Sequence, residues 1–492
     1  MGAGCCTKSL HESENNKQSN STDLSYNDQS PRVQIQPNYK ALPNRFGRSR
    51  TTKGQVPGIA GLENLGNTCY IGSAIQCLSN CQPLIDYFLA EIYTKDLNVK
   101  NPMGTGGELT LAFAELVCTN WQDSYDCIVP KHLVRTVWKH SSIFKPEMES
   151  DVHEFMIFML EKLHEDLNRA SRSPTVKVPQ LEEDTNEEIR AAKAWQQHLK
   201  CNSSVIVDLF QGQFKSTITC SVCNQVSTKF DVFQYLSLSI PSNQKKVNLE
   251  DCISEFTKNE ELEEGWNCLN CNRSTSAFKR ISIWKVPPIL ILLLKRFEFT
   301  NKTSRKLKNS VKFPLADLSL EKHVEGLQRE PPVYNLFAKV DHQGNINSGH
   351  YTTTAKNRKS NKWYIFDDEH VSQAEKDDLV NGDTYMLFYH KASVQEYWRQ
   401  SKSMPDHWPH VLGSPKFGSS LSGPMARTGS IIEEDSKMNT QTKLDSKLEL
   451  KPELKSQVAP PPDSATLIHS RSSDMGNLIP PSYFFKSLSS DS

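Results

Sequence analysis

The chain has 492 residues, which is enough for one large domain or for two to three ordinary ones. Its 57 basic and 57 acidic residues give a formal net charge of zero, so no nucleic-acid partner is expected. The first thirty residues are polar, and the apolar run Ile289–Leu294 is too short to span a bilayer. Thirteen cysteines without a signal peptide indicate a cytoplasmic protein with reduced thiols.

Composition divides the chain into three parts. Residues 1–57 are rich in Ser, Asn and Gln and are predicted to be disordered, and residues 391–492 are predicted to form a disordered Ser- and Pro-rich tail. Between them, residues 58–390 show helical spacing first and strand patterns from about residue 205. This order predicts an α+β domain with a mostly antiparallel sheet. Residues 169–200, which have an acidic centre, are expected to form a surface insertion.

The segment Gly61–Ser79 predicts a reactive cysteine. Cys69 follows a Gly- and Asn-rich turn and begins an apolar helix, where unpaired N–H groups and a partial positive charge favour a thiolate. The turn, Asn64–Thr68, supplies backbone and amide donors of the kind that form an oxyanion hole. A lone cysteine before a helix is more often buried and inert, so this hypothesis requires a base and an orienting group elsewhere in the chain.

Two later segments supply candidates for those groups. His350 follows a polar loop, and Asp367 and Asp368 end a strand-like run seventeen residues later. Adjacent strands would place a carboxylate beside the imidazole and fix its tautomer, so that the other ring nitrogen takes the thiol proton. A cysteine with a distant His and Asp is typical of a cysteine hydrolase. Taken alone, His350 is equally consistent with an ordinary loop histidine, and Asp367 with an ordinary carboxylate at a strand end.

Two CxxC pairs predict a metal site. Cys220 and Cys223 are followed, after 44 intervening residues, by Cys268 and Cys271. Two such pairs in a reduced protein are typical of a tetrahedral Cys₄ zinc site, with one Zn²⁺ per chain. Four protein sulfurs leave no open coordination position, so this zinc would be structural. The alternative is a pair of chance turns that bind nothing.

Together these segments resemble the ubiquitin-specific protease family of cysteine deubiquitinases. The resemblance covers residues 58–390, and its motifs stand in the family's order. The matching segments are Gly61–Tyr70, Gln76–Leu78, Asp151–Phe155, Phe210–Phe214, the two CxxC pairs, Leu292–Phe297, Ser348–Tyr351, Trp363–Asp368 and Asp383–Tyr389. The resemblance implies a papain-like cysteine protease fold of the ubiquitin-specific protease type, with a helical thumb, an antiparallel β palm and zinc-bearing β fingers.

The same resemblance implies roles for single residues. Cys69 would attack the carbonyl of the final glycine of ubiquitin. His350 would act as the base and then as the acid, and Asp367 would orient it. Asn64 would donate its side-chain amide to the oxyanion, with Asp368 as a second polar support. The result would be hydrolysis of isopeptide or peptide bonds, which removes ubiquitin from conjugated proteins.

Two departures from the family pattern leave other functions open. Tyr70 is followed by Ile71-Gly72 where the family usually has Met-Asn, and a glycine there costs about 0.5–1 kcal/mol of helix stability. Glu149-Ser150 replace Gln-Gln before Asp151, which would reduce turnover. Asp151 itself suits either the basic ubiquitin tail or the N-cap of the next helix. A weak or silent ubiquitin-binding scaffold stays an alternative, as does a protease for another ubiquitin-like modifier.

The N-terminus resembles a lipidation site. Gly2 is a candidate for myristoylation and Cys5 and Cys6 are candidates for palmitoylation, although Thr7 stands one place after the preferred Ser or Thr. Residues 1–57 hold eight Lys/Arg and four Asp/Glu, a net charge of +4. Acylation together with a basic patch would hold the protein at a membrane. An unmodified tail is the alternative, and these patterns specify no oligomeric state.

Overall fold

The structure is a computed structural model, and it describes residues 56–123, 125–170, 186–241, 246–299, 304–345 and 348–393. The acylation candidates Gly2, Cys5 and Cys6 lie outside the described residues. So do nearly all of the two segments that the sequence predicts to be disordered, residues 1–57 and 391–492. None of the helices within the described ranges is long and apolar enough to cross a membrane.

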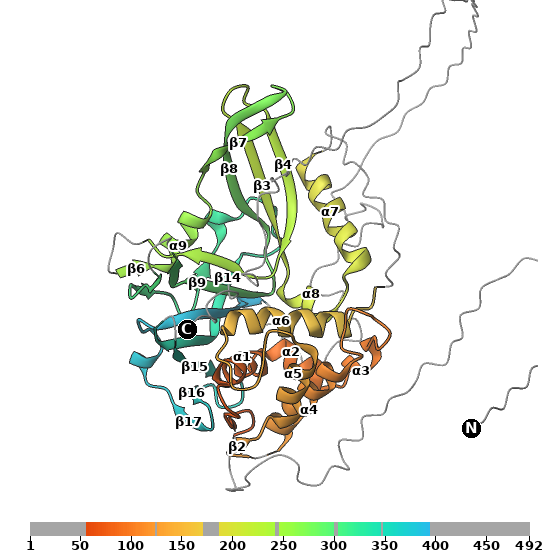
Figure 1. Ribbon diagram of the computed structural model, residues 1–492, viewed down its shortest axis with the longest axis vertical. Coiled ribbons are helices and arrows are strands. Elements are labelled where there is room, and N and C mark those ends of the chain that lie inside the picture. The colour runs from red at the N-terminus through yellow and green to blue at the C-terminus, as the bar shows by residue number, and fades with distance from the viewer. Residues whose placement is uncertain are drawn as a thin grey trace, which may run out of the picture. The chain divides into compact units, whose positions relative to one another are not determined.

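A group of helices forms the first third of the fold (Figure 1, red to yellow). The helices are α1 (Cys69–Ser79), α2 (Gln82–Leu89), α3 (Tyr93–Asp96), α4 (Glu108–Gln122), α5 (Lys131–His140) and α6 (Val152–Asp166), with a short parallel pair of strands, β1 (Gly61–Leu62) and β2 (Cys127–Ile128). Every residue of α1 except Gly72 is buried, including the polar Ser73, Gln76 and Ser79, as expected for a helix that is enclosed by other elements. It packs against α6 on one side and the palm sheet on the other.

Four strands form the fingers, which extend away from the helices (Figure 1). They are β3 (Gly212–Cys220), β4 (Val226–Phe233), β7 (Glu260–Cys268) and β8 (Arg273–Lys285), paired antiparallel in the order β4-β3-β8-β7. The turn of each outer hairpin contains an asparagine with positive φ, Asn224 or Asn272. Asparagine tolerates this left-handed conformation better than most residues. These tight turns bring the two CxxC pairs to the fingertips.

The palm is a sheet of eight strands among the described residues, in the order β17-β16-β15-β14-β18-β9-β5, with β13 pairing β14. The strands are β5 (Leu236–Ser239), β9 (Ile289–Lys295), β13 (Leu318–Ser319), β14 (Val333–Gly344), β15 (Gly349–Lys356), β16 (Trp363–Asp367), β17 (His370–Gln373) and β18 (Thr384–Lys391). Only the β5–β9 pairing is parallel in this described sheet, so the predicted mostly antiparallel sheet is confirmed.

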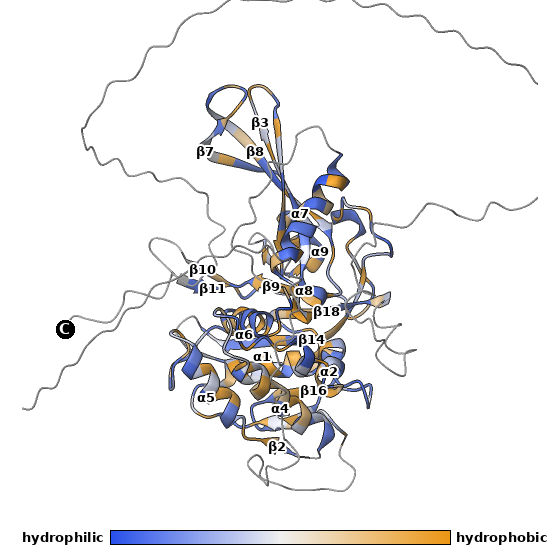
Figure 2. Ribbon diagram, turned by 90° about the vertical axis from the view of Figure 1, so that its right-hand side faces the viewer, coloured by the Kyte–Doolittle hydropathy of each residue, from blue (hydrophilic) through white to orange (hydrophobic). Residues whose placement is uncertain are grey.

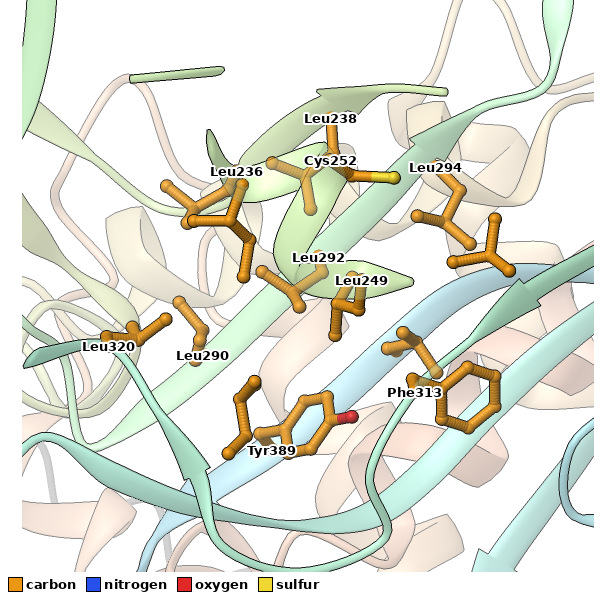
Figure 3. Close-up of a cluster of buried hydrophobic side chains, with 14 of the residues drawn as sticks. Leu236, Leu238, Leu249, Cys252, Leu290, Leu292, Leu294, Phe313, Leu320 and Tyr389 are labelled. Atoms are coloured by element: carbon orange, nitrogen blue, oxygen red, sulfur yellow. The ribbon is translucent and has the colours of Figure 1, made fainter. Parts of the chain in front are cut away.

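An apolar core fixes the centre of the palm (Figure 3). Leu290, Leu292 and Leu294 of β9 pack with Leu249 of α9 (Leu249–Phe256) and with Tyr389 of β18. Burying each such leucine contributes about 1.5–3 kcal/mol. The apolar run that is too short for a membrane is therefore the buried strand β9, and it supports its neighbour β18 and, through that strand, β14 and β15.

The remaining described elements connect these parts. They are α7 (Glu187–Cys201), α8 (Val205–Phe210), β6 (Lys246–Asn248), β10 (Phe297–Phe299), β11 (Ser304–Lys306), β12 (Ser310–Lys312) and the 3₁₀ turns η2 (Glu321–His323) and η3 (Lys376–Asp378). In Figure 2 the finger strands carry both hydrophilic and hydrophobic residues up to the tip. The fingers thus expose apolar side chains away from the core, including Val222 and Leu269.

Part of the expected surface insertion, residues 169–200, is instead a packed helix. Residues 171–185 lie outside the described residues, but α7 begins at Glu187. Its Ala191 and Trp195 side chains are buried, and the Lys285 ammonium lies 3.7 Å from the centre of the Trp195 ring. The acidic run hid this helix from the sequence analysis. Glu187 and Glu188 occupy the first turn of α7, where they interact favourably with the helix dipole.

Candidate active site

A tight turn holds Cys69 at the first position of α1. The Asn64 side-chain oxygen accepts hydrogen bonds from the backbone N–H groups of Gly66 and Thr68, at 3.1 and 3.0 Å. It also accepts the Thr68 hydroxyl at 3.1 Å, and that hydroxyl accepts the Leu65 N–H at 2.9 Å. These bonds close the turn before the helix. Cys69 is 7% exposed and lies at the N-terminus of the buried helix α1.

The other two predicted catalytic residues lie on neighbouring strands. His350 is the second residue of β15, and Asp367 is the last residue of β16, which pairs antiparallel with β15. The Nε2 atom of His350 lies 2.6 Å from Oδ1 of Asp367. The other hydrogen-bond partner of the imidazole is the Cys69 side chain. The structure therefore brings Cys69, His350 and Asp367, which are spread over nearly 300 residues, into one chain of contacts.

These contacts shift the titration of the imidazole. The hydrogen bond with Cys69 raises the pKa of His350, burial lowers it, and the hydrogen bond with Asp367 raises it again. The result is a pKa of about 9, well above the ordinary value of 6.5. His350 therefore carries a proton near neutral pH, next to the sulfur.

Asp368 is held beside Asn64 by its backbone and its side chain. Its φ of +51° turns the chain at the end of β16, and its carbonyl oxygen accepts the Leu62 N–H at 2.8 Å. The side-chain amide of Asn64 donates to Oδ2 of Asp368 at 2.9 Å. The sequence predicts this amide as an oxyanion donor, and the structure shows that one of its two hydrogens is already bound to Asp368.

Burial changes the chemistry of Asp368 as well. It raises the pKa of the carboxyl, while the Asn64 hydrogen bond lowers it. The ligand atoms of His350, Asp367 and Asp368 lie within 4.8 Å of one another. Because His350 is bound to Asp367 and Asp368 to Asn64, the hydrogen bonds account for this proximity without a metal.

The four predicted zinc ligands meet at the fingertips. The sulfurs of Cys220 and Cys271 are 3.9 Å apart, and those of Cys223 and Cys268 are 3.5 Å apart. All four sulfurs lie within 4.8 Å of one another, and none of these cysteines forms a disulfide. A tetrahedron with metal–sulfur bonds of about 2.3 Å has edges of about 3.8 Å. This group of cysteines thus has the ligand type and spacing of a metal site, and Thr275 adds an outer contact 3.3 Å from the Cys220 sulfur.

Comparison with known proteins assigns the fold and the motifs to one family. Residues 60–389 match the family model described as ubiquitin carboxyl-terminal hydrolase. The chain belongs to the ubiquitin carboxyl-terminal hydrolase family. It is 35% identical over 351 residues to ubiquitin carboxyl-terminal hydrolase 2 of Rattus norvegicus. The matched region covers 70% of this chain and 56% of that protein. The chain is 34% identical over 352 residues to ubiquitin carboxyl-terminal hydrolase 21 of Homo sapiens, which covers 68% and 61%.

The chain spans less than two thirds of the length of these relatives. Among solved structures, it is similar to one chain of the SAGA Ubp8/Sgf11/Sus1/Sgf73 DUB module bound to ubiquitin aldehyde. The TM-score is 0.54 at 25% identity, covering 70% of this chain and 72% of that chain. A chain of the same module bound to monoubiquitin gives 0.54 at 26% identity, covering 69% and 72%. The predicted family and its thumb, palm and fingers fold are confirmed.

Asp151, which belongs to one of the matching sequence segments, forms hydrogen bonds through both carboxylate oxygens. Oδ1 caps α6 by accepting the N–H groups of His153 and Glu154, at 2.7 and 3.3 Å. The predicted N-cap is therefore confirmed. Oδ2 accepts the Tyr385 hydroxyl at 2.6 Å, a contact between residues 234 positions apart that the sequence does not reveal. Burial, followed by the charge of Asp151, raises the pKa of Glu154 to about 7.

Proposed function

We propose that this chain is a cysteine-type deubiquitinase that hydrolyses isopeptide or peptide bonds at the C-terminal glycine of ubiquitin. The observation that carries the proposal is the contact chain from Cys69 through His350 to Asp367, placed between the thumb helix and the palm sheet. The similarity to DUB-module chains bound to ubiquitin aldehyde and to monoubiquitin supports ubiquitin as the substrate. Ubiquitinated proteins are the proposed partners.

In the proposed reaction, the Cys69 thiolate attacks the carbonyl carbon of the terminal glycine, and His350 holds the thiol proton. His350 then passes this proton to the departing lysine amine as the carbon–nitrogen bond breaks, which leaves a thioester on Cys69. A water molecule gives a proton to His350 and attacks the thioester. The thiolate leaves, and ubiquitin is released with a free carboxyl group. Asp367 keeps the ring in the required orientation throughout.

The developing oxyanion is assigned to the second amide hydrogen of Asn64 and to the first N–H groups of α1. Those N–H groups have no partner within the helix, and their dipole favours negative charge. Asp368 fixes the Asn64 side chain through the 2.9 Å hydrogen bond. Because this donor is oriented before substrate arrives, it stabilises the transition state without reorganisation.

A structural Zn²⁺ is proposed for the fingertips, held by Cys220, Cys223, Cys268 and Cys271. The sulfur spacing and the outer contact from Thr275 support it. Bound there, the ion would cross-link the turns of two hairpins. It takes no part in bond cleavage, because four sulfurs fill its coordination shell.

Localisation is proposed from the sequence, since the residues concerned lie outside the described ones. We propose that the protein is cytoplasmic and is held at a membrane by acyl groups on Gly2, Cys5 and Cys6. The net charge of +4 over residues 1–57 would strengthen this membrane binding. A variant with Gly2→Ala, Cys5→Ser and Cys6→Ser should move from the membrane fraction to the soluble fraction. Finding the wild type wholly in the soluble fraction would contradict acylation.

The proposed activity is tested by hydrolysis of ubiquitin amides that carry a C-terminal fluorophore. Wild type should release the fluorophore, and His350→Ala should release it far more slowly. A wild-type protein that binds ubiquitin but releases nothing would instead be the silent scaffold. Release from an amide of another ubiquitin-like modifier, but not from ubiquitin, would change the substrate assignment and keep the chemistry.

A further inference from the structure

A short exposed segment joins two walls of the active site, the turn before Cys69 and the strand that carries His350. The segment, residues 147–149, is called the strap here, and it ends two positions before the N-cap of α6, Asp151. On the thumb side, the amide of Asn67 donates to the Glu147 carbonyl oxygen at 2.7 Å. Asn67 stands two residues before Cys69, so this end of the strap is attached to the nucleophile turn.

The other end of the strap is attached to the histidine strand. Oε1 of Glu149 accepts the Ser348 hydroxyl at 3.2 Å, and Oε2 accepts the Gly349 N–H at 3.3 Å. These two residues directly precede His350, and they lie about 200 positions from Glu149 in the sequence. One carboxylate therefore joins the strap to the wall that carries the base.

The strap is thus bound to both walls at the level of the reacting groups. A peptide tail that lies between Cys69 and His350 has to pass between these same walls. We infer that Glu149 is a latch residue: its two hydrogen bonds hold the strap closed across the entrance, and the ubiquitin tail must break them to enter. This inference rests on the proposed function, and it names a control over access to the same site.

The strap is exposed and has a strained backbone, so it can open at small cost. Glu147, Met148 and Glu149 are all exposed. Glu147 has a φ of +66°, a conformation that non-glycine residues rarely adopt. The α6 cap at Asp151 stays fixed by its three hydrogen bonds, so it provides a firm point about which the strap can move.

A substrate contact at Glu149 would predict the opposite effect on binding. If the carboxylate held the ubiquitin tail, removing it would raise KM. If it holds the strap closed, removing it lowers KM, because substrate no longer competes with the two hydrogen bonds. The sign of the KM change therefore decides between a latch and a binding residue.

The test uses the full chain with four substitutions and a fluorogenic ubiquitin amide. Glu149→Ala removes both acceptors, Glu149→Gln keeps one side-chain oxygen, and Ser348→Ala removes one donor. Glu161→Ala is the matched control, since Glu161 is an exposed glutamate on α6. Alkylation of Cys69 by iodoacetamide shows for each protein that the nucleophile is intact.

We expect Glu149→Ala to lower KM roughly fivefold at unchanged kcat, the effect of about one exposed hydrogen bond. Ser348→Ala and Glu149→Gln should lower KM less, and Glu161→Ala should not change it. The double variant Glu149→Ala/Ser348→Ala should match Glu149→Ala alone, because Ser348 acts through that carboxylate.

A raised or unchanged KM for Glu149→Ala would overturn the latch. The latch would also be overturned if Glu149→Ala lowered KM and the double variant lowered it further by the full effect of Ser348→Ala. The two groups would then act separately. Failure of the proposed function looks different: every protein, wild type included, would be alkylated but would hydrolyse no ubiquitin amide. That result would contradict the deubiquitinase assignment and the latch together.

Discussion

The catalytic cleft and the fingertips both join residues that lie far apart in the sequence, but different forces hold them. The cleft is formed where a buried helix meets a sheet, and its turn, strands and helix cap are tied by hydrogen bonds such as those of Asn64 and Asp151. The fingertips lie beyond the core, where Val222 is 54% and Leu269 is 89% exposed. Packing can position the cleft, whereas the fingertips would be held by the proposed metal cross-link.

This difference predicts that the two regions fail separately. Damage to the cleft should abolish catalysis and leave the fold intact. Loss of the proposed metal should loosen the fingers and leave the reactivity of Cys69 unchanged. The following changes are ordered from the largest expected effect to the smallest.

Removing the base should have the largest effect. His350→Ala should lower kcat by about 10² to 10⁴ fold, the usual contribution of a positioned general base. The melting temperature should fall only modestly, because the His350 side chain is 40% exposed and solvent screens its interactions. Steady-state hydrolysis and thermal unfolding measure the two effects. Activity within a fewfold of wild type would remove His350 from the mechanism.

Disrupting the fingertip site should lower stability without affecting the nucleophile. Cys220→Ser should abolish binding of about one metal ion per chain and lower the melting temperature by about 5–10 °C, as expected for a loss of a few kcal/mol in a domain of this size. Elemental analysis and calorimetry measure these, and the alkylation rate of Cys69 should stay the same. Cys201→Ser is the control, because Cys201 is a free cysteine outside the cluster. Equal stability without metal would contradict the cross-link.

Raising the pH should remove the stability that protonated His350 contributes at the cleft. The pKa of His350 is raised from 6.5 to about 9, so its protonated form contributes stability that is fully present below pH 6.5. This contribution is lost as the pH rises through 9. Hydrolysis should fall over the same range, because His350 then no longer carries the proton that it passes to the leaving amine. The melting-temperature difference between wild type and His350→Ala should shrink over this window. A difference that stays constant with pH would contradict the raised pKa.

Filling the space beside Gly72 should have the smallest effect, and it should be stabilising. A Cβ added at Gly72 would meet only Oδ1 of Asp368, at 4.0 Å, in a cavity of about 10 Å³. Gly72→Ala should therefore raise the free energy of unfolding by about 0.5–1 kcal/mol, the helix preference of alanine over glycine.

Gly61→Ala provides the contrast for Gly72→Ala, because its Cβ would lie 2.3 Å from the Glu369 carbonyl oxygen and should destabilise the protein. Chemical denaturation measures both variants. A destabilised Gly72→Ala would show that the space beside Asp368 is needed, and it would overturn the view that Gly72 only lowers helix stability.

Strong local signals in the sequence predicted the main residues of both regions. A turn before an apolar helix indicated Cys69, and two short strands indicated His350 and Asp367. Paired CxxC spacing indicated the four cysteines at the fingertips. Each of these patterns lies within a few residues, so it is visible before any packing is known.

Contacts that depend on packing between distant segments were not predictable. The Asn64–Asp368 and Asp151–Tyr385 hydrogen bonds join residues 304 and 234 positions apart, and each follows from how helices dock on the sheet. The strap and its Glu149 bonds are of the same kind. The α7 helix was missed partly for a local reason, because its acidic first turn resembles a solvated loop. The burial of Trp195 depends on contact with the finger strand β8, which the sequence does not reveal.

The most direct test of the central claim is the reaction of the full chain with ubiquitin that carries a thiol-reactive group at its C-terminus. Wild type should form a covalent adduct, and Cys69→Ala should form none while still binding ubiquitin. An adduct that persists in Cys69→Ala, or a wild type that is alkylated by iodoacetamide but never reacts with the ubiquitin probe, would contradict the claim that Cys69 is the nucleophile of a deubiquitinase.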